Sequence, residues 1–221
     1  MSTSYARRPF NDYAEQYDAW YDSFKGRALL ATEVACLRPL MERFLRPYLE
    51  VGVGTGRFAD TLGVECGVDP SPRALARARQ RGVNAVLGVG EELPFKEAQF
   101  GGVLVAFTLC FVRNPYQVVR EIRRVLIPGG GLVLGLLLIG PPWADFYARR
   151  GAEGDPLYKA AHFYSKEEVE VLLEQAGFRI AEYRTTLFQE PGLEVYEEER
   201  PVEGYVPGGG FVGIMAVKTG Q

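Results

Sequence analysis

A short apolar segment that runs into three alternating glycines constrains the fold of this 221-residue chain more than any other feature. Residues 49–51 read as a buried strand, and Gly52, Gly54 and Gly56 follow before a helical pattern begins. Glycine allows a sharp turn and lets a ligand lie against bare main chain. The amides at the start of the helix favour an anionic group such as a carboxylate. The segment therefore predicts a strand–turn–helix unit with a ligand at the carboxyl end of the strand.

The rest of the chain alternates between short apolar runs and helical patterns, which predicts an α/β fold with a largely parallel sheet. The expected strands are 49–51, 64–69, 83–87, 102–107, 132–138, 178–187 and 211–217. Ser71, Asn114 and Ser165 are expected to cap helices. Pro128, Gly129 and Gly130 are expected to break the helix before the fifth strand. The loop that joins the last two strands reads as a solvated edge.

The first 45 residues read as two helices that precede the sheet. Tyr13, Tyr17, Trp20 and Phe24 recur at helical spacing and predict one aromatic face. Since no linker or repeat separates this segment from the rest, we expect residues 1–45 to form a helical lid of the same domain.

Composition limits the classes of partner. A net charge of −3 and a pI near 5.4 argue against a nucleic-acid binder. The longest apolar run, 132–139, is shorter than the about 20 residues that a membrane-spanning helix needs. Cys36, Cys66 and Cys110 lie far apart without a CxxC pair, so we expect reduced thiols and no metal site. These features predict a cytoplasmic protein without stable membrane insertion.

An acidic residue, Asp69, ends the second expected strand. Asp69 lies thirteen residues after Gly56, and a carboxylate there can accept two hydrogen bonds from a ribose diol. The spacing Gly54-x-Gly56-x-x-Ala59 also satisfies the dinucleotide fingerprint. The glycine turn and Asp69 therefore predict an adenosyl ligand but leave NAD and S-adenosylmethionine equally open.

Four further blocks distinguish these cofactors. Residues 88–95, 107–112, 125–130 and 165–178, taken with the glycine turn, resemble the class I (Rossmann-like) S-adenosylmethionine-dependent methyltransferases, most closely the small-molecule branch typified by ubiquinone and menaquinone biosynthesis. The resemblance spans about Phe10 to Lys218. It implies a three-layer fold with a seven-stranded sheet in the order 3-2-1-4-5-7-6, strand seven antiparallel, and a cofactor-binding domain over 46–221. The family usually has an acid where Val89 stands, which leaves the contact with the adenine amine to another residue such as Glu91.

The resemblance also implies a cofactor site. Residues around the methionine part would be Glu50, Gly52, Gly54 and Gly56. Those around the ribose and adenine would be Asp69, Pro70, Gly90 and Glu91. Phe107 and Thr108 would close the pocket below the sulfonium, and Tyr13 and Tyr17 would lie over the cofactor.

Methyl transfer is an in-line displacement from an activated donor, so positioning can supply most of the catalysis. A general base is needed only when the acceptor must lose a proton. His162, the only histidine, is a candidate base, although a loop or packing role suits it as well. Trp20, Phe111, Trp143 and Tyr147 are expected either to line an apolar acceptor pocket or to pack helices.

Three functions remain compatible with these patterns. The first is methyl transfer to a small molecule. The second is an NAD-dependent oxidoreductase, which explains the glycine turn and Asp69 but none of the other blocks. The third is a non-catalytic protein that binds S-adenosylmethionine and regulates or scaffolds. The patterns do not name the acceptor or the oligomeric state.

Overall fold

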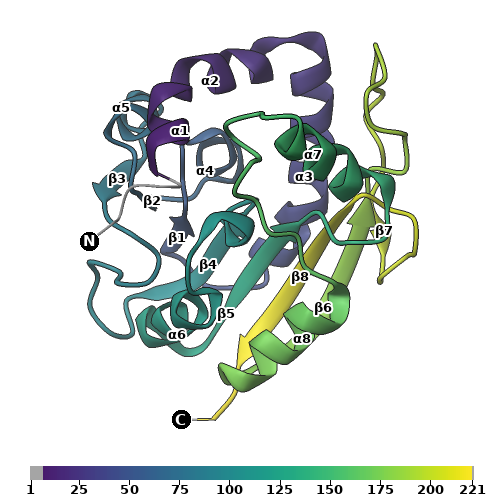
Figure 1. The fold of residues 1–221 in the computed structure, drawn as a ribbon. Coiled ribbons are helices and arrows are strands. Elements are labelled where there is room, and N and C mark those ends of the chain that lie inside the picture. Colours follow the sequence, from purple (N-terminus) through teal and green to yellow (C-terminus); the bar gives the residue numbers. More distant parts are fainter. Residues whose placement is uncertain (1–6, 221) are drawn as a thin grey trace.

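The computed structural model describes residues 7–220 and has one mixed β-sheet with helices on both faces (Figure 1). The strands are β1 (Tyr48–Val51), β2 (Cys66–Asp69), β3 (Asn84–Leu87), β4 (Phe100–Ala106), β5 (Leu126–Leu136), β6 (Phe178–Thr186), β7 (Val202–Glu203) and β8 (Phe211–Lys218). Their spatial order is β3-β2-β1-β4-β5-β8-β6-β7. Strands β1 to β5 pair in parallel, and β8 runs antiparallel between β5 and β6.

The predicted α/β class and strand order are confirmed, with one correction to the strand count. The sheet has eight strands instead of seven, because Val202 and Glu203 add a short edge strand that pairs with Thr185 and Arg184 of β6. Strand β8 takes the place expected for the seventh strand. A two-residue strand is too short to show the alternating apolar pattern that identifies longer strands in a sequence. The sequence therefore predicts a loop at these residues.

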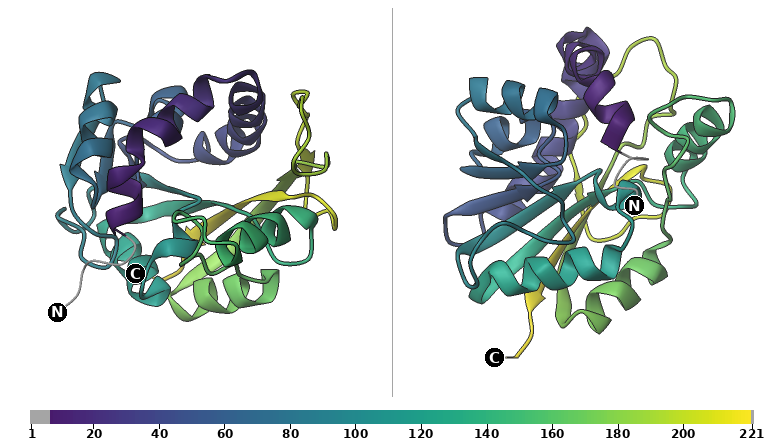
Figure 2. Two further views of the ribbon diagram at one scale, coloured as in Figure 1. Left: turned by 45° about the horizontal axis from the view of Figure 1, so that its top comes forward. Right: turned by 60° about the vertical axis from the view of Figure 1, so that its left-hand side comes forward.

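Helices cover both faces of this sheet (Figure 2). They are α1 (Arg7–Asp12), α2 (Ala14–Asp22), α3 (Phe24–Met41), α4 (Arg57–Leu62), α5 (Pro72–Gln80), α6 (Pro115–Val125), α7 (Pro142–Ala152) and α8 (Lys166–Gln175), with a short 3₁₀ helix at Leu109–Phe111. One apolar core lies between the sheet and helices α3 to α5, and a second lies between the sheet and helices α6 and α8. Helices α1 and α2, which we term the lid helices, lie above the carboxyl ends of the parallel strands.

The predicted helix starts are confirmed by their capping hydrogen bonds. Ser71 Oγ accepts from the Ala74 amide at 3.2 Å, and Asn114 Oδ1 accepts from the Gln117 amide at 3.0 Å. Ser165 forms the expected capping box with Glu168. These side chains satisfy amides that have no partner within the helix, which is why short polar residues mark helix starts in a sequence.

Two boundaries differ from expectation. The break predicted at residues 128–130 is wrong, because α6 ends at Val125 and β5 runs from Leu126 through these residues. The pairing of β4 and β5 shifts register between Phe100 and Gly102, which accommodates Pro128 within the strand.

The N-terminal segment forms three helices instead of two over residues 7–41. Ser23 has an extended backbone, ends α2 and caps α3 by accepting from the Gly26 amide at 3.0 Å.

Candidate functional site

The glycine turn (residues 52–56) joins β1 to α4 at the carboxyl edge of the sheet. Gly52, Gly54 and Gly56 have φ angles of 77°, 50° and 84°, a region that side chains disfavour. The amides of Gly52 and Val53 donate to Val68 O of β2 at 2.8 and 3.1 Å, which fixes the turn against the neighbouring strand. A Cβ atom built on Gly54 has no described heavy atom within 4 Å, so the main chain at Gly54 faces open space.

Asp69 closes the turn from β2. Its two carboxylate oxygens accept from the amides of Gly54 at 2.9 Å and Ser71 at 2.8 Å. Burial raises the pKa of Asp69 to about 6, against the lowering effect of these two amides. A carboxylate oxygen has more than one acceptor site. Asp69 can therefore hold the turn and still accept from a ligand, as a ribose-binding acid must. Pro70 follows it directly.

Glu50 of β1 is the second acid at this edge. Its side chain is buried, and its Oε2 atom has no hydrogen-bond partner in the part of the chain that the structure describes. Burial and the neighbouring Asp69 raise the pKa of Glu50 well above its ordinary value. A buried carboxyl oxygen without a partner costs free energy unless a ligand satisfies it. Bare glycine main chain beside an unsatisfied acid fits the methionine part of the cofactor that the resemblance implies.

Gly90 and Glu91 lie in the segment after β3. A Cβ atom on Gly90 would stand 3.1 Å from Val51 Cγ1, so only a small residue fits against the end of β1. Glu91 Oε1 accepts from the amides of Arg113 at 3.0 Å and Asn114 at 3.4 Å. Glu91 therefore anchors the segment that follows β4, a role that the sequence did not indicate, and its contact with adenine stays a prediction.

Phe107 and Thr108 follow β4 beside the glycine turn. Thr108 Oγ1 lies 3.4 Å from Gly52 O and 3.0 Å from Ala106 O. Phe107 has a φ of 54°, an unusual conformation for a side chain of this size, and its ring packs on Phe58 and Phe211. Such strain persists where the surroundings enforce it and is frequent at functional sites. This segment separates the glycine turn from the cavity described next.

A pocket of about 400 Å³, here called the aromatic cavity, lies between the lid helices, α3, the end of β4 and α7. More than half of the residues that line it are aromatic. The predicted residues that it brings together are Tyr13, Tyr17, Trp20, Phe107, Phe111, Trp143 and Tyr147. Phe24 does not join them, because the end of α2 at Ser23 breaks the helical spacing and leaves Phe24 63% exposed.

Several lining residues were missed from the sequence. They are Phe10, Tyr21, Glu33, Tyr158 and Tyr196, which come from α1, α2, α3 and two loops. For Glu33 a signal was present. It lies four residues after Leu29 and four before Leu37, on the apolar face of α3, and an acid at such a position is unusual.

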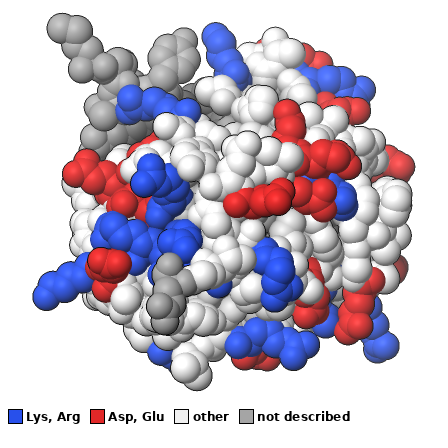
Figure 3. All heavy atoms as spheres, turned by 90° about the horizontal axis from the view of Figure 1, so that it is seen from below, with Lys and Arg blue, Asp and Glu red and all other residues white. Residues whose placement is uncertain are grey.

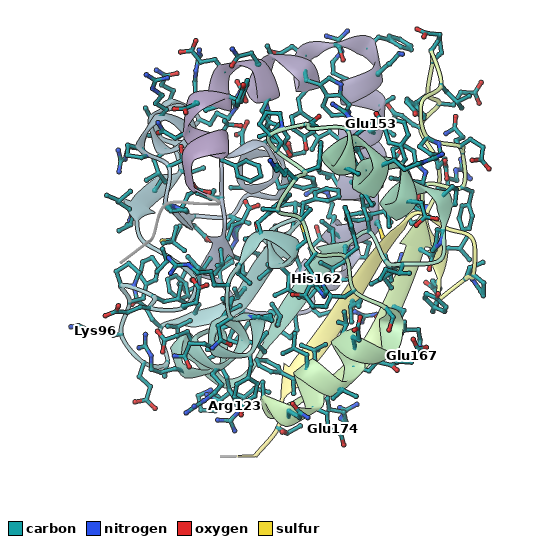
Figure 4. The ribbon with its side chains drawn as sticks, viewed as in Figure 1. Lys96, Arg123, Glu153, His162, Glu167 and Glu174 are labelled. Atoms are coloured by element: carbon teal, nitrogen blue, oxygen red, sulfur yellow. The ribbon has the colours of Figure 1, made fainter. Side chains whose placement is uncertain are left out.

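His162 lies in the segment between α7 and α8 (Figure 4). Its side chain is exposed, its ring packs edge-on against Tyr164, and it is not among the lining residues of the aromatic cavity. Its backbone amide donates to Cys110 O at 2.9 Å. Cys110 itself lines the cavity, and burial raises the pKa of its thiol to about 12.

Ion pairs hold the lid helices to the sheet domain. Asp18 of α2 is buried and binds Arg57 Nε at 2.8 Å and Arg81 Nη2 at 3.0 Å. Burial opposes its ionisation, but the hydrogen bonds from both arginines outweigh that effect and lower the pKa of Asp18 to about 2. Arg57 directly follows the glycine turn, so the same pairs couple the lid helices to the turn.

The face opposite the site carries charges of both signs. In Figure 3, which views the molecule from below, basic and acidic side chains are interspersed across the described residues. Across residues 7–220, none of the helices is long and apolar enough to cross a membrane.

Comparisons with known proteins agree with this geometry. A family model described as a methyltransferase domain matches residues 49–134. The chain is 33% identical to a Thermotoga maritima structure described as an S-adenosylmethionine-dependent methyltransferase, possible histamine N-methyltransferase, with a TM-score of 0.86 over 97% of this chain and 100% of that one. It is 57% identical to an uncharacterized protein of Mycobacterium tuberculosis over 92% of this chain and 72% of the relative. It is 29% identical to a demethylmenaquinone methyltransferase of Beutenbergia cavernae over 79% of this chain and 83% of the relative.

Proposed function

The chain belongs to the class I S-adenosylmethionine-dependent methyltransferases, and from that premise we propose that it methylates a small molecule held in the aromatic cavity. S-adenosylmethionine is its cofactor. The observation that carries the proposal is the position of Phe107 and Thr108: Thr108 touches the glycine turn, and Phe107 lines the cavity. A cofactor on one side and an acceptor on the other would meet at this segment.

The proposed cofactor site follows the residues at the carboxyl edge. Glu50 and the bare main chain of the glycine turn would bind the methionine part, Asp69 would accept from the ribose hydroxyls, and Pro70, Gly90 and Glu91 would adjoin the adenine. When bound, S-adenosylmethionine supplies a methyl group on a positively charged sulfur. Aromatic faces such as those of Tyr13, Tyr17 and Phe107 would favour that charge.

The protein's own contribution is proposed to be positioning and exclusion of water. The lid helices and α7 line the aromatic cavity and would shield part of an acceptor from bulk water. The side chain of His162 is exposed and does not line the aromatic cavity. We therefore do not expect it to contact an acceptor held there. A substrate that needs no base, or that loses its proton before binding, suits this cavity.

The size of the cavity supports a small-molecule acceptor. A volume of about 400 Å³ falls within the range of pockets for metabolites. The names of two relatives point the same way, since histamine and demethylmenaquinone are both small molecules. No observation favours the NAD-dependent alternative over this one.

A matched pair of glycine variants tests the proposal. Gly54 and Gly82 both have positive φ, and a Cβ atom on either meets no heavy atom within 4 Å. Alanine at either position should cost about 1–2 kcal/mol of stability from backbone strain. Only Gly54→Ala places a methyl group where the cofactor is proposed to lie.

The readout is S-adenosylhomocysteine formed from S-adenosylmethionine in the presence of a panel of small metabolites. We expect turnover by the wild type and by Gly82→Ala, and loss of turnover and of S-adenosylhomocysteine binding in Gly54→Ala. Equal activity of the two variants would refute the placement of the cofactor. Failure of every acceptor, with cofactor binding intact, would refute the small-molecule assignment.

A further inference from the structure

A buried acid in the aromatic cavity has no place in the proposed cofactor site. Glu33 of α3 is 6% exposed and lines the cavity, and its Oε2 atom has no hydrogen-bond partner among residues 7–220. Burial raises the pKa of Glu33 well above its ordinary value. A carboxyl group buried in this way is costly for the fold unless something that enters the cavity satisfies it.

The other charged residues of the lining are already neutralised. Lys25 Nζ lies 3.0 Å from Glu194 Oε2, and Arg150 Nη2 lies 2.6 Å from Asp155 Oδ2. Arg150 also lies over the rings of Tyr147 and Tyr158. Among the described lining residues, Glu33 is therefore the acid that these ion pairs leave without an oppositely charged partner. A positively charged ligand would supply one.

Three tyrosines share the lining of the aromatic cavity with Glu33, namely Tyr17, Tyr21 and Tyr147. Burial raises the pKa of Tyr17, Tyr21 and Tyr147, and the nearby charge of Glu33 raises each further. The hydroxyls of Tyr17 and Tyr21 lie 3.1 Å apart, with their rings edge to face. These phenols stay neutral at physiological pH and offer aromatic faces beside one acid. Aromatic faces around a carboxylate are the chemistry that recognises an ammonium group.

We propose that the methyl acceptor carries an ammonium group, which Glu33 binds among the tyrosine rings of the aromatic cavity. This inference rests on the proposed function and narrows its substrate class to molecules that combine an ammonium group with an apolar body; the ammonium nitrogen has no lone pair, so it serves recognition and another atom accepts the methyl group. An anionic acceptor would meet Glu33 without a compensating cation. A neutral acceptor of the same shape would gain the apolar contacts but not the ion pair.

Pairs of probes that differ only in charge test the proposal. A panel of alkylammonium and arylalkylammonium ions, from butylammonium to 2-phenylethylammonium, is titrated by calorimetry beside the alcohol of the same chain length. The protein is used with and without saturating S-adenosylhomocysteine. We expect at least one ammonium ion to bind the wild type at least tenfold more tightly than its alcohol, because a charge-assisted contact is lost in the alcohol.

Two isosteric variants assign this preference to its residue. Glu33→Gln should abolish the preference for ammonium and leave the Kd for S-adenosylhomocysteine within twofold of the wild-type value, which also shows that the variant is folded. Glu50→Gln, a change at the other unsatisfied buried acid, should weaken S-adenosylhomocysteine binding and keep the preference for ammonium.

Three results would overturn the inference. The first is that no ammonium probe binds more tightly than its alcohol. The second is that the preference for ammonium survives in Glu33→Gln. The third is that Glu33→Gln weakens binding of S-adenosylmethionine far more than binding of S-adenosylhomocysteine, which would assign Glu33 to the sulfonium. If the wild type binds no S-adenosylhomocysteine, the proposed function fails, and the comparison of probes on the cofactor-free protein still decides the role of Glu33.

Discussion

At the scale of single residues, the site depends on acids that the fold buries. Asp69 could be located from the sequence, because its spacing from the glycine turn is set by one strand–turn–helix unit. Glu33 could not be assigned a ligand in this way, because Tyr17, Tyr21 and Tyr147, which line the cavity with it, come from α2 and α7. Spacing within one helix identifies an unusual acid but does not reveal which distant side chains surround it.

The pKa of Asp69 gives a pH-dependent prediction. Its folded value of about 6 is raised above the ordinary value of an aspartate, so the protein without cofactor holds Asp69 protonated below that pH and ionised above it. The ribose hydroxyls need an ionised acceptor. The Kd for S-adenosylhomocysteine should therefore be constant above about pH 7 and increase roughly tenfold per pH unit well below pH 6.

Asp69→Asn should remove this pH dependence and weaken binding about 10- to 100-fold at pH 7.5, the loss expected for hydrogen bonds to a charged group. Asp60→Asn, a change of an exposed carboxylate on the adjacent α4, serves as the control and should behave like the wild type. A Kd that does not vary between pH 5 and 8 would contradict the role of Asp69. Both quantities are measured by calorimetry.

At the scale of elements, the sequence predicted those features that depend on residues close together in the chain. The caps at Ser71, Asn114 and Ser165 were found because each satisfies amides within three residues of itself. The short strand β7 was not predicted, because its pairing with β6 depends on contacts between residues that lie apart in the chain. The ion pairs of Asp18 were missed for the same reason, since Arg57 and Arg81 lie 39 and 63 residues further along the chain.

Removing the charge of Asp18 should loosen the lid helices. Asp18→Asn leaves two partly buried arginines without their shared partner, and we expect a loss of about 2 kcal/mol in the free energy of unfolding at pH 7. The lowered pKa means that this contribution is complete above about pH 4 and is lost as the pH falls through 2.

Urea denaturation of the wild type and the variant measures this difference at pH 7 and at pH 3. Asp22→Asn is the matched control, because Asp22 also pairs with Arg57 but is 64% exposed, and its replacement should change stability little. Equal effects of the two variants would show that burial of Asp18 does not stabilise the lid helices.

At the scale of the whole molecule, the sequence predicted the architecture well because the alternation of strands and helices covers most of the chain. Burial on both faces gives β4 and β5 nearly continuous apolar runs, which mark central parallel strands. The place of the lid helices was implied only by the family resemblance, because their amphipathic pattern shows that they bury a face but not which surface they cover.

The cofactor should stabilise this whole architecture. A ligand at 100 times its Kd adds about 2.7 kcal/mol to the folded state, which for a chain of this length corresponds to about 5–10 °C in Tm. We therefore expect S-adenosylmethionine and S-adenosylhomocysteine to raise Tm by this amount in differential scanning fluorimetry. NAD at the same concentration should leave Tm unchanged, and a larger shift with NAD would revive the oxidoreductase alternative.

The chain has two tryptophans, Trp20 and Trp143, and both line the aromatic cavity. Indole emission depends strongly on the polarity of its surroundings. The entire tryptophan fluorescence of the native protein therefore originates at the walls of a single binding space. Filling or emptying that space would alter the protein's natural emission, and the arrival and departure of an acceptor could be timed without any attached dye.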